Sequence, residues 1–333
     1  MKALVYTQPH QLQWQQVEDA QAATGEVVLK IDAVGICGSD MHAWHGHDPR
    51  RKPGLILGHE FAGEVVQSRS DAITEGMRVT GNPLIACGYC EYCVQGRNNL
   101  CVNRTMVGMT RPGAFAERMA IPASCLISIP EGMPANHAAL TEPAATALHA
   151  ISISQAHLTK PISDCRTLIL GGGAIGMFCA LLLKHHTAGE CSVAELNPLR
   201  RESISLATGA KAFDPIKDPA LADSYDYVID AVGAKATRNT ALEAVKPGGV
   251  VMHIGLMDWA SEIDMRKLTL AEITLLGAYT YTQKDLCQAL ELLHQGALGP
   301  LDWIATRPLA QGAGAFTGLD KGEIPSAKVV LVS

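Results

Sequence analysis

The chain has no excess of positive charge, and this argues against one large class of partners. Its 333 residues carry 27 Lys and Arg against 33 Asp and Glu, which gives a formal net charge of -6 at pH 7. A protein whose main ligand is a nucleic acid or an anionic membrane surface usually has the opposite balance. We therefore expect a small-molecule substrate, with no nucleic acid and no membrane as partner.

A targeting segment and an unbroken apolar span are also lacking. The first residues contain no continuous apolar region and no small-residue cleavage site, so no signal peptide is predicted. The only long apolar run, 167–183, is interrupted by glycines between Gly171 and Gly176. A buried strand that turns into a helix explains this run better than a membrane span. Ten cysteines without an export signal predict a reducing, cytoplasmic setting.

Length and rhythm predict two domains in an α/β fold. A chain of this size is too long for one ordinary core. Up to about residue 140, short strands alternate with Gly- and Pro-containing turns, which favours a barrel-like, β-rich domain. Strands then alternate with helices, which favours a doubly wound parallel sheet. We place a catalytic segment at 1–144, a nucleotide-binding domain at 145–278 and a return segment of the first domain at 279–333.

The second domain is expected to have strands at 167–170, 191–194, 227–230, 250–254 and 273–276, with one helix ending at 184 and another at 197–208. A helix at 284–295 and a last strand at 327–331 follow. The segment 246–249, Lys-Pro-Gly-Gly, is interpreted as a turn that leads into the next strand.

Four cysteines are spaced C-x2-C-x2-C-x7-C, at Cys87, Cys90, Cys93 and Cys101. This spacing lets each short loop return a thiol to one centre, so it predicts a tetrahedral structural zinc. A non-catalytic zinc protein that binds nucleic acid or a partner through this loop is the alternative, although no Lys/Arg stripe surrounds it. The scattered cysteines are predicted to be small buried hydrophobes: Cys125, Cys165, Cys179, Cys191 and Cys287.

A glycine motif follows the strand predicted at 167–170. Gly171, Gly173 and Gly176 form G-x-G-x-x-G ahead of an apolar helix that opens with Ala174 and Ile175. The first glycine permits a tight turn, the second lets backbone approach a pyrophosphate, and the third allows close packing of helix on strand. This context predicts a dinucleotide site; a tight turn without a ligand is the alternative.

Glu195 ends the next predicted strand, where a carboxylate accepts hydrogen bonds from the adenosine ribose and repels a 2'-phosphate. It favours NAD over NADP. Arg200 and Arg201 are either solvated helix charges or help to accept a phosphate. Later strand-end loops are expected to line the cofactor cleft, with Val232, Gly233, Ile254 and Gly255.

A second set of metal-binding residue types consists of Cys37, His59 and Glu60, followed by Glu142 at the domain junction. Three mixed protein ligands that leave one position open are typical of a catalytic zinc. The alternative is a core thiol at Cys37 and a surface pair at His59 and Glu60.

Together these motifs resemble the zinc-containing medium-chain alcohol dehydrogenases. The resemblance runs from about residue 25 to the C-terminus and includes the segments 35–42 (GICGSDMH) and 58–65 (GHEFAGEV), the four-cysteine loop and the glycine motif. Glu142-Pro143 is similar to the sorbitol and other polyol dehydrogenases. The resemblance implies NAD as cofactor, two zinc ions per subunit and a homo-oligomer, either dimer or tetramer.

The resemblance also implies roles for single residues. Cys37 and His59 would bind zinc, Glu60 would be a standing or exchanging ligand, and Glu142 would bind zinc or hold its water. Asp40 would orient His59. Ser39 would contact the substrate, and His42 would end a proton relay. Thr146 and Tyr279 would contact the nicotinamide half of the cofactor or line the pocket.

The implied reaction moves a hydride from a secondary alcohol to NAD, most simply from a polyol or sugar alcohol. Phosphorylated polyols, sugar acids, simple secondary alcohols and threonine are alternatives. Sorbitol itself is disfavoured, because Ala43 stands in place of an aromatic residue and Thr280 in place of an arginine. A zinc-free quinone reductase of the same superfamily is disfavoured because it should lack Cys37 and His59.

Two local patterns keep two interpretations each. His45 and His47, close to His42, are either solvated loop side chains or ligands of another metal. The run 50–52, Arg-Arg-Lys, is either solvent-facing charge or an anion-recognising rim. Four aromatic residues either shape the pocket or belong to the core: Trp44, Phe115, Tyr279 and Tyr281.

Overall fold

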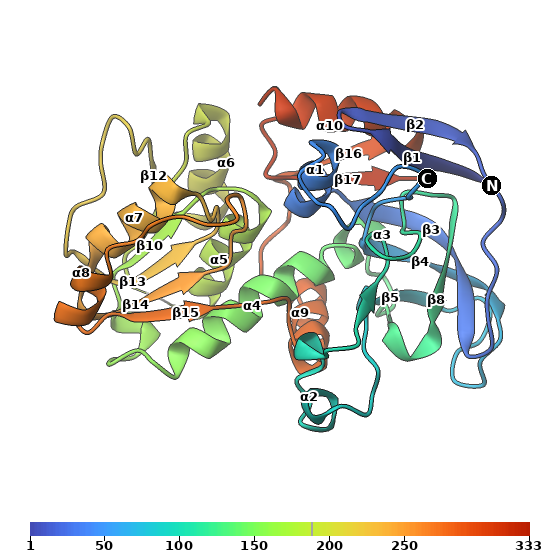
Figure 1. Cartoon of the computed structure of the whole chain (residues 1–333), viewed down its shortest axis with the longest axis horizontal. Coiled ribbons are helices and arrows are strands. Elements are labelled where there is room, and N and C mark those ends of the chain that lie inside the picture. Colours follow the sequence, from blue (N-terminus) through green and yellow to red (C-terminus); the bar gives the residue numbers. More distant parts are fainter. Residues whose placement is uncertain (188) are drawn as a thin grey trace.

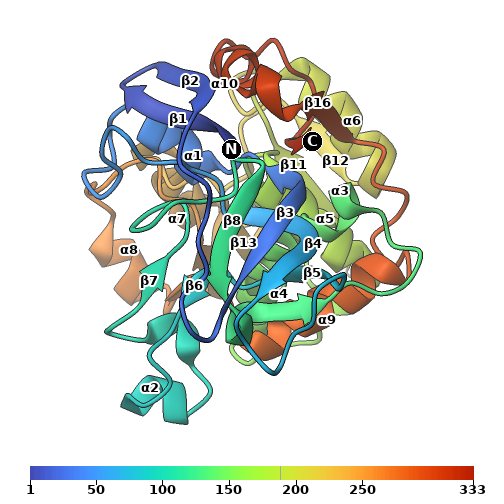
Figure 2. The ribbon, with the colours of Figure 1, turned by 90° about the vertical axis from the view of Figure 1, so that its right-hand side faces the viewer.

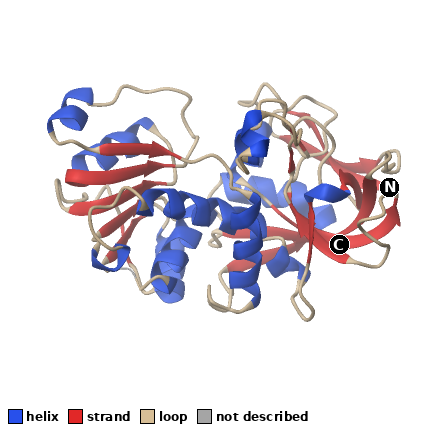
Figure 3. Cartoon of the chain, turned by 90° about the horizontal axis from the view of Figure 1, so that it is seen from below, coloured by secondary structure: helices blue, strands red, loops and turns tan. Residues whose placement is uncertain are grey.

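The computed structural model describes residues 1–187 and 189–333, which form two lobes (Figure 1). Helix α4, Thr141–Gln155, runs between the lobes in the middle of the molecule. Each lobe contains its own sheet, and helices lie between and around the two sheets when the molecule is seen from below (Figure 3). No helix in the described part of the chain is long and apolar enough to cross a membrane.

The first lobe is built on a seven-stranded sheet of order β16-β17-β3-β4-β5-β9, with β8 also paired to β3. Most of its pairs are antiparallel, which confirms the β-rich prediction. The strands are β3 Glu26–Gly35, β4 Glu60–Ser68, β5 Arg78–Gly81, β8 Arg118–Pro122, β9 Leu126–Ser128, β16 Ile304–Pro308 and β17 Lys328–Val332. Because β17 pairs with β3, the last strand of the chain belongs to this sheet.

Smaller elements surround this sheet (Figure 2). They are the hairpin β1 Lys2–Gln8 and β2 Gln11–Gln16, the short pair β6 Leu84–Ile85 and β7 Thr105–Met106, and the helices α1 Gly38–Trp44, α2 Glu91–Val94, α3 Ala135–Ala138 and α10 Gly312–Asp320. Short 3-10 turns occupy Asn98–Leu100, Ala123–Cys125, Ile162–Asp164 and Leu309–Gln311. A core that includes Leu29, Phe61 and Phe316 holds this lobe together.

The second lobe is a six-stranded parallel sheet of order β12-β11-β10-β13-β14-β15. Its strands are β10 Thr167–Leu170, β11 Cys191–Ala194, β12 Lys211–Phe213, β13 Tyr225–Asp230, β14 Val245–His253 and β15 Thr274–Gly277. Its helices are α5 Ala174–His185, α6 Pro198–Thr208, α7 Lys235–Ala244, α8 Met265–Leu270 and α9 Gln283–His294. The predicted doubly wound sheet is confirmed.

The strand order reverses at β10, which has β11 on one side and β13 on the other. In an open parallel sheet, the crevice at the carboxyl ends of such strands is where nucleotides bind. Strands β10 and β11 are nearly continuous apolar runs. Helices cover both faces of this parallel sheet, so neither face of these strands needs polar side chains. The glycine motif begins one residue after β10, directly at this crevice.

Two local predictions were wrong. The segment 246–249 is not a free turn, because β14 already begins at Val245 and continues across a register irregularity opposite β13. Among the scattered cysteines, Cys287 is exposed; Cys125, Cys165 and Cys179 are buried and Cys191 is partly so. The helical period places Cys287 on the solvent face of α9, whose other face packs on α4.

The proposed domain boundaries stay predictions. The boundary at 144/145 falls inside α4, and α9, which we placed in the return segment, packs against α4. Nδ1 of His149 in α4 and a carboxylate oxygen of Asp285 in α9 lie 2.8 Å apart, within hydrogen-bond distance. The return segment therefore has a helical part against the linking helix and a strand part in the first sheet.

Candidate active site and metal centres

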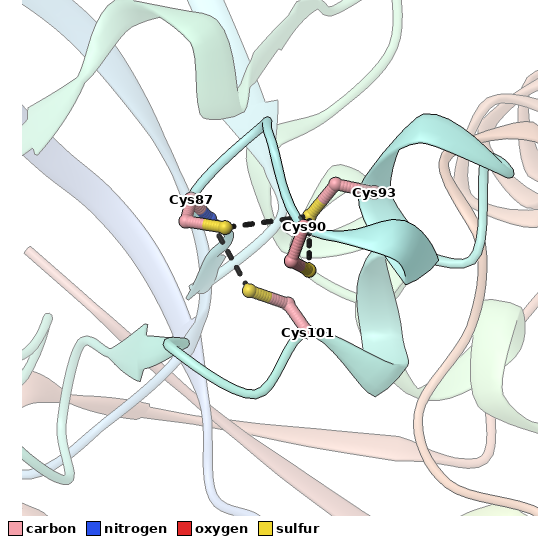
Figure 4. A group of neighbouring side chains, drawn as sticks. All are labelled: Cys87, Cys90, Cys93 and Cys101. Carbon is pink, nitrogen blue, oxygen red and sulfur yellow. Dashed lines mark hydrogen bonds between the residues drawn. The ribbon is translucent and has the colours of Figure 1, made fainter.

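The four predicted cysteines converge in one loop of the first lobe (Figure 4). The sulfur of Cys93 lies 3.9 Å from that of Cys87 and 3.5 Å from that of Cys90. A tetrahedron with zinc–sulfur bonds of about 2.3 Å has sulfur–sulfur edges of about 3.8 Å, whereas a disulfide bond is about 2.05 Å long. The spacing thus fits four thiolates around one ion, and backbone N–H donors, first of all that of Tyr89, lower the pKa of Cys87 to about 6.

This loop is tied to the segment that follows the parallel sheet. The Asn99 side-chain amide donates to the carbonyl oxygen of Tyr279 at 2.9 Å. The guanidinium of Arg104 lies 4.8 Å from the Tyr279 ring centroid and donates to the Cys101 carbonyl oxygen. The metal-binding loop therefore supports Tyr279, a residue expected at the pocket.

Strand pairing brings the second ligand set together. Strands β3 and β4 are antiparallel, and Gly35 at the end of β3 pairs with Glu60 at the start of β4. Cys37, two residues after β3, consequently lies beside His59, and the ligand atoms of Cys37, His59 and Glu60 all lie within 4.8 Å of one another. Gly35 is required here because a Cβ would collide with the Glu60 carboxylate.

Asp40 lies beside Nδ1 of the His59 ring, and so orients that ring. One oxygen of Asp40 lies 3.4 Å from Nδ1 of His59, and the other accepts a hydrogen bond from the backbone N–H of Cys37 at 3.0 Å. Both residues are buried. With Nδ1 directed at Asp40, Nε2 is the nitrogen left for a metal.

A buried lysine completes the group. Nζ of Lys328, from β17, lies 2.7 Å from both carboxylate oxygens of Glu60 and 2.9 Å from the carbonyl oxygen of Ile36. Glu142, from α4, is buried nearby but lies outside the group of atoms within 4.8 Å. Burial, reinforced by the charge of Glu60, raises the pKa of Glu142 to about 7.

The donor set fits a divalent cation. Burial alone would lower the pKa of His59, but the charges of Asp40 and Cys37 outweigh it and raise this pKa well above its usual range. The negative charges around His59 therefore favour a positive charge at this position, either a proton on the imidazole or a bound cation. A thiolate, an imidazole and a carboxylate are together the ligand types of zinc.

Helix α1 presents the predicted relay residues. The Ser39 hydroxyl oxygen accepts a hydrogen bond of 3.1 Å from Arg51. His42, also on α1, is half-buried, and burial followed by the charges of His47 and His45 lowers its pKa below the usual value. A histidine with this shift stays neutral, and able to accept a proton, to a lower pH.

Both interpretations of the run 50–52 were wrong for Arg51. Its side chain is fully buried and donates to Asp48 at 2.7 Å, to the Gly108 carbonyl oxygen at 3.0 Å and to Ser39. Arg50 is 56% exposed and also pairs with Asp48, and Lys52 is exposed. Arg51 is thus a buried support of α1.

The glycine motif has the geometry of a phosphate loop. A Cβ at Gly171 would collide with Val232, and one at Gly176 would collide with the Gly171 backbone, whereas a Cβ at Gly173 would meet open space. Gly173 caps the start of α5 without a side-chain hydrogen bond. Among the described residues, no side chain caps the first N–H groups of α5, from Ala174 and Ile175 on, so these groups can bind an anion.

Glu195 lies at the carboxyl end of β11, as predicted. Its two oxygens accept hydrogen bonds of 2.8 Å from the backbone N–H groups of Gly172 and Asn197. Arg201 is engaged with the carbonyl oxygens of Glu195 and Leu196. Within the described residues, Nε of Arg200 is buried without a hydrogen-bond partner.

The other predicted cofactor residues lie on the loops around this crevice. Asp230 accepts hydrogen bonds from the N–H groups of Val232 and Gly233, and a Cβ at Gly233 would collide with Gly255, so the loop ending at Gly233 and the loop of Ile254 and Gly255 touch. On α4, Thr146 lies one turn after Glu142 and donates to its carbonyl oxygen at 3.3 Å. Ligand and cofactor predictions thus meet on one helix face.

The comparisons with known proteins cover the whole chain. The alcohol dehydrogenase GroES-like domain family matches residues 23–131, and the zinc-binding dehydrogenase family matches 174–295. L-threonine 3-dehydrogenase of Chelativorans sp. is 30% identical over 99% of this chain and 98% of the relative. L-galactonate-5-dehydrogenase of Escherichia coli is 29% identical over 90% of this chain and 88% of the relative.

This chain is a zinc-containing medium-chain dehydrogenase.

Solved structures of this dehydrogenase family have the same fold. Acetophenone reductase of Geotrichum candidum in complex with NAD superposes with a TM-score of 0.89 at 28% identity, over 100% of this chain and 97% of the other. A zinc-binding dehydrogenase of Sinorhizobium meliloti bound to NADP gives a TM-score of 0.86 at 28% identity, over 100% and 99%.

Sequence reasoning missed two supports of this dehydrogenase site, Lys328 and Arg51. A lysine that begins the otherwise apolar strand 328–332 was a signal, because a buried lysine needs an acidic partner. Arg51 gave no comparable signal, since it stands in a run of three basic residues. Of the predicted aromatic residues, Trp44 and Phe115 are core residues of the first lobe, and Tyr281 is buried too.

Proposed function

We propose that this dehydrogenase oxidises a secondary alcohol of a polyol or sugar alcohol to the ketone and transfers the hydride to NAD. One observation carries the proposal: Cys37, which is partly buried, and the buried residues His59 and Glu60 form a mixed-ligand group, next to a helix that also presents Glu142 and Thr146. A structural zinc site, in which the protein supplies all four ligands, would not need this combination of donors.

Cys37, His59 and Glu60 would hold the catalytic zinc, with Glu142 as a further ligand or as the residue that holds water. Bound zinc supplies a Lewis acid that favours the ionised form of the alcohol. Asp40 fixes the His59 ring. The ammonium group of Lys328 holds the Glu60 carboxylate next to the site, so Glu60 could either stay near the metal or exchange.

Ser39 and His42 carry the proton away from the substrate. Arg51 donates to one lone pair of the Ser39 hydroxyl. The other lone pair would accept the proton of the substrate alcohol, and the Ser39 hydroxyl hydrogen would pass on in the direction of His42; the ribose of a bound cofactor would link the two residues. Because its pKa is lowered, neutral His42 accepts this proton and releases it to solvent.

The glycine loop and Glu195 support NAD as the cofactor. The free N–H groups at the start of α5 would bind the pyrophosphate, and the carboxylate of Glu195 would repel a 2'-phosphate. Arg200, with an unpartnered Nε, is the residue that would favour NADP instead. A Glu195→Gln variant should therefore show a smaller preference for NAD over NADP.

A carboxylated substrate is the second candidate. The guanidinium of Arg104 lies over the ring of Tyr279, 4.8 Å from its centroid, so one cationic group stands beside this pocket residue. The two relatives named above act on L-threonine and L-galactonate, which are carboxylated alcohols. Arg104→Gln should raise the KM for acids by a larger factor than the KM for neutral polyols.

The test is an initial-rate screen of sugar alcohols, sugar acids, their phosphates, simple secondary alcohols and threonine with NAD and NADP, alongside zinc analysis. We expect two zinc ions per chain and NAD-dependent oxidation of a polyhydroxylated substrate. Protein that contains only one zinc, or that transfers no hydride from any of these alcohols, would contradict the proposal. A non-catalytic zinc protein would give that result.

We also propose that the protein is a homo-oligomer through the edge of the parallel sheet. Strand β15 is the last strand of that sheet, and Leu275 on it is 42% exposed. A cavity of about 430 Å³, lined in part by Trp259 and Leu275, lies beside this edge. A charged substitution, Leu275→Glu, should shift the sedimentation of the protein toward the monomer.

A further inference from the structure

Three side chains from distant parts of the sequence meet on the surface of the first lobe, at the end of α1, the helix that also carries His42. His10 lies in the β1–β2 turn, His45 follows α1, and Asp320 ends α10. One ligand atom of each lies within 4.8 Å of the others. Figures 1 and 2 both place the β1–β2 hairpin, α1 and α10 together, at the opposite end of this lobe from the four-cysteine loop.

The backbone fixes this meeting. His10 has a positive φ of 63°, and its N–H donates to the Trp44 carbonyl oxygen at 2.6 Å, which ties the hairpin turn to the end of α1. Gly46 allows the close approach, because a Cβ there would lie 2.8 Å from the Pro9 ring. The His10 ring then rests edge-on against Trp44, with the ring centroids 4.6 Å apart.

The electrostatics favour a cation. Nε2 of His45 lies 2.7 Å from the Asp320 carboxylate, and the centroids of the His10 and His45 rings are 5.3 Å apart. The C-terminal ends of α1 and α10 both reach this point, and helix C-termini carry partial negative charge. Two imidazoles, one carboxylate and two helix ends surround a position that is open to solvent.

We propose that His10, His45 and Asp320 form a third metal site, which binds a divalent transition ion such as Zn²⁺ or Ni²⁺. Two imidazoles and a carboxylate form a ligand set used for zinc, with water in the remaining position. Ligands of a tetrahedral zinc lie about 3.4 Å apart, so the His45–Asp320 pair, which is 2.7 Å apart here, would open slightly around the ion. The ion clamps the hairpin and α10 to α1, the helix that carries Ser39 and His42.

Titration calorimetry with Ni²⁺ on untagged, zinc-loaded holoenzyme at pH 7.5 tests this site. We expect one binding event per chain beyond the two zinc ions already present. His45→Ala and Asp320→Asn should each weaken it by roughly 100-fold or more, since even changes behind a ligand cost 10–100-fold. His47→Ala is the matched control, because its ring lies 5.5 Å from that of His45 but outside the group.

Thermal unfolding gives a second readout. Saturating Ni²⁺ should raise the Tm of the wild-type protein and of His47→Ala by roughly 5 °C, but not that of His45→Ala or Asp320→Asn. Circular dichroism without added Ni²⁺ reports whether the variants are folded. The absence of a third binding event, or its survival in the His45→Ala/Asp320→Asn double variant, would overturn the proposal.

Discussion

The two predicted zinc groups differ in how the chain assembles them. The four cysteines come from one loop, partly exposed, and their sulfur atoms have no carboxylate or lysine partner among the described residues. The group of Cys37, His59 and Glu60 is built from two paired strands and is supported by Asp40 and, from the far end of the chain, Lys328. A structural zinc site is thus encoded by one local segment, whereas a catalytic zinc site needs residues from distant parts of the chain to set its charge.

The largest expected effect comes from breaking the second group. Cys37→Ser should abolish turnover, by roughly 1,000-fold or more, because a metal Lewis acid contributes several kcal/mol to the barrier. NAD binding, measured by fluorescence titration, should persist, since the glycine loop is in the other lobe. Cys287→Ser, an exposed cysteine outside both groups, is the control. Retained turnover in Cys37→Ser would refute the division of roles.

Breaking the first group should instead cost stability. Cys90→Ser should lose one zinc per chain and about 4 kcal/mol of stabilisation, a fall in Tm of roughly 10 °C. Metal analysis and thermal unfolding measure both effects. Turnover at low temperature should survive in part, with a raised KM because the loop also supports Tyr279. If the Tm is unchanged while turnover vanishes, the two groups have been assigned the wrong way round.

The proton relay next to the second group should show a pH signature. His42→Ala should reduce kcat/KM for oxidation by about 100-fold, the range of general base catalysis. In the wild-type protein the rate should fall only below about pH 6.5, because the pKa of His42 is lowered and its neutral form persists there. Loss of that limb in His42→Ala, compared with the exposed control His157→Ala, confirms the role. An unchanged pH profile would contradict it.

The smallest effect concerns the support of α1. Burial alone would raise the pKa of Asp48, but Arg50 and Arg51 hold it at about 2, below the ordinary 3.8. A depressed carboxyl pKa stabilises the fold above the ordinary value and loses this contribution as pH falls toward 2. Asp48→Asn should thus cost about 2 kcal/mol at neutral pH.

Urea unfolding of Asp48→Asn and of the wild-type protein measures this difference. The gap in unfolding free energy should be complete at pH 7 and should shrink below about pH 4. A gap that stays constant across this range would show that Asp48 acts through packing and not through its charge.

Much of the fold could be read from local patterns. The parallel strands follow from short apolar runs separated by helices, and the register of β10 with β11 and β13 agrees with the predicted residues. The segment 246–249 could not be placed, because Pro and Gly signal a turn whether or not neighbouring backbone continues the sheet around it. Cys287 was misplaced because composition alone does not say which face of a helix meets solvent.

The sequence by itself determined the ligand types and the phosphate loop, because spacing of a few residues fixes which side chains a turn brings together. The spacing of residues within each segment was enough to predict the metal loop at Cys87 to Cys101 and the phosphate loop at Gly171 to Gly176. Only the tertiary structure decided what surrounds them: Lys328 beside Glu60, Arg51 under Ser39, and His10 beside His45 and Asp320. The first and third of these contacts join residues from opposite ends of the chain, and burial and charge depend on such packing rather than on the order of residues.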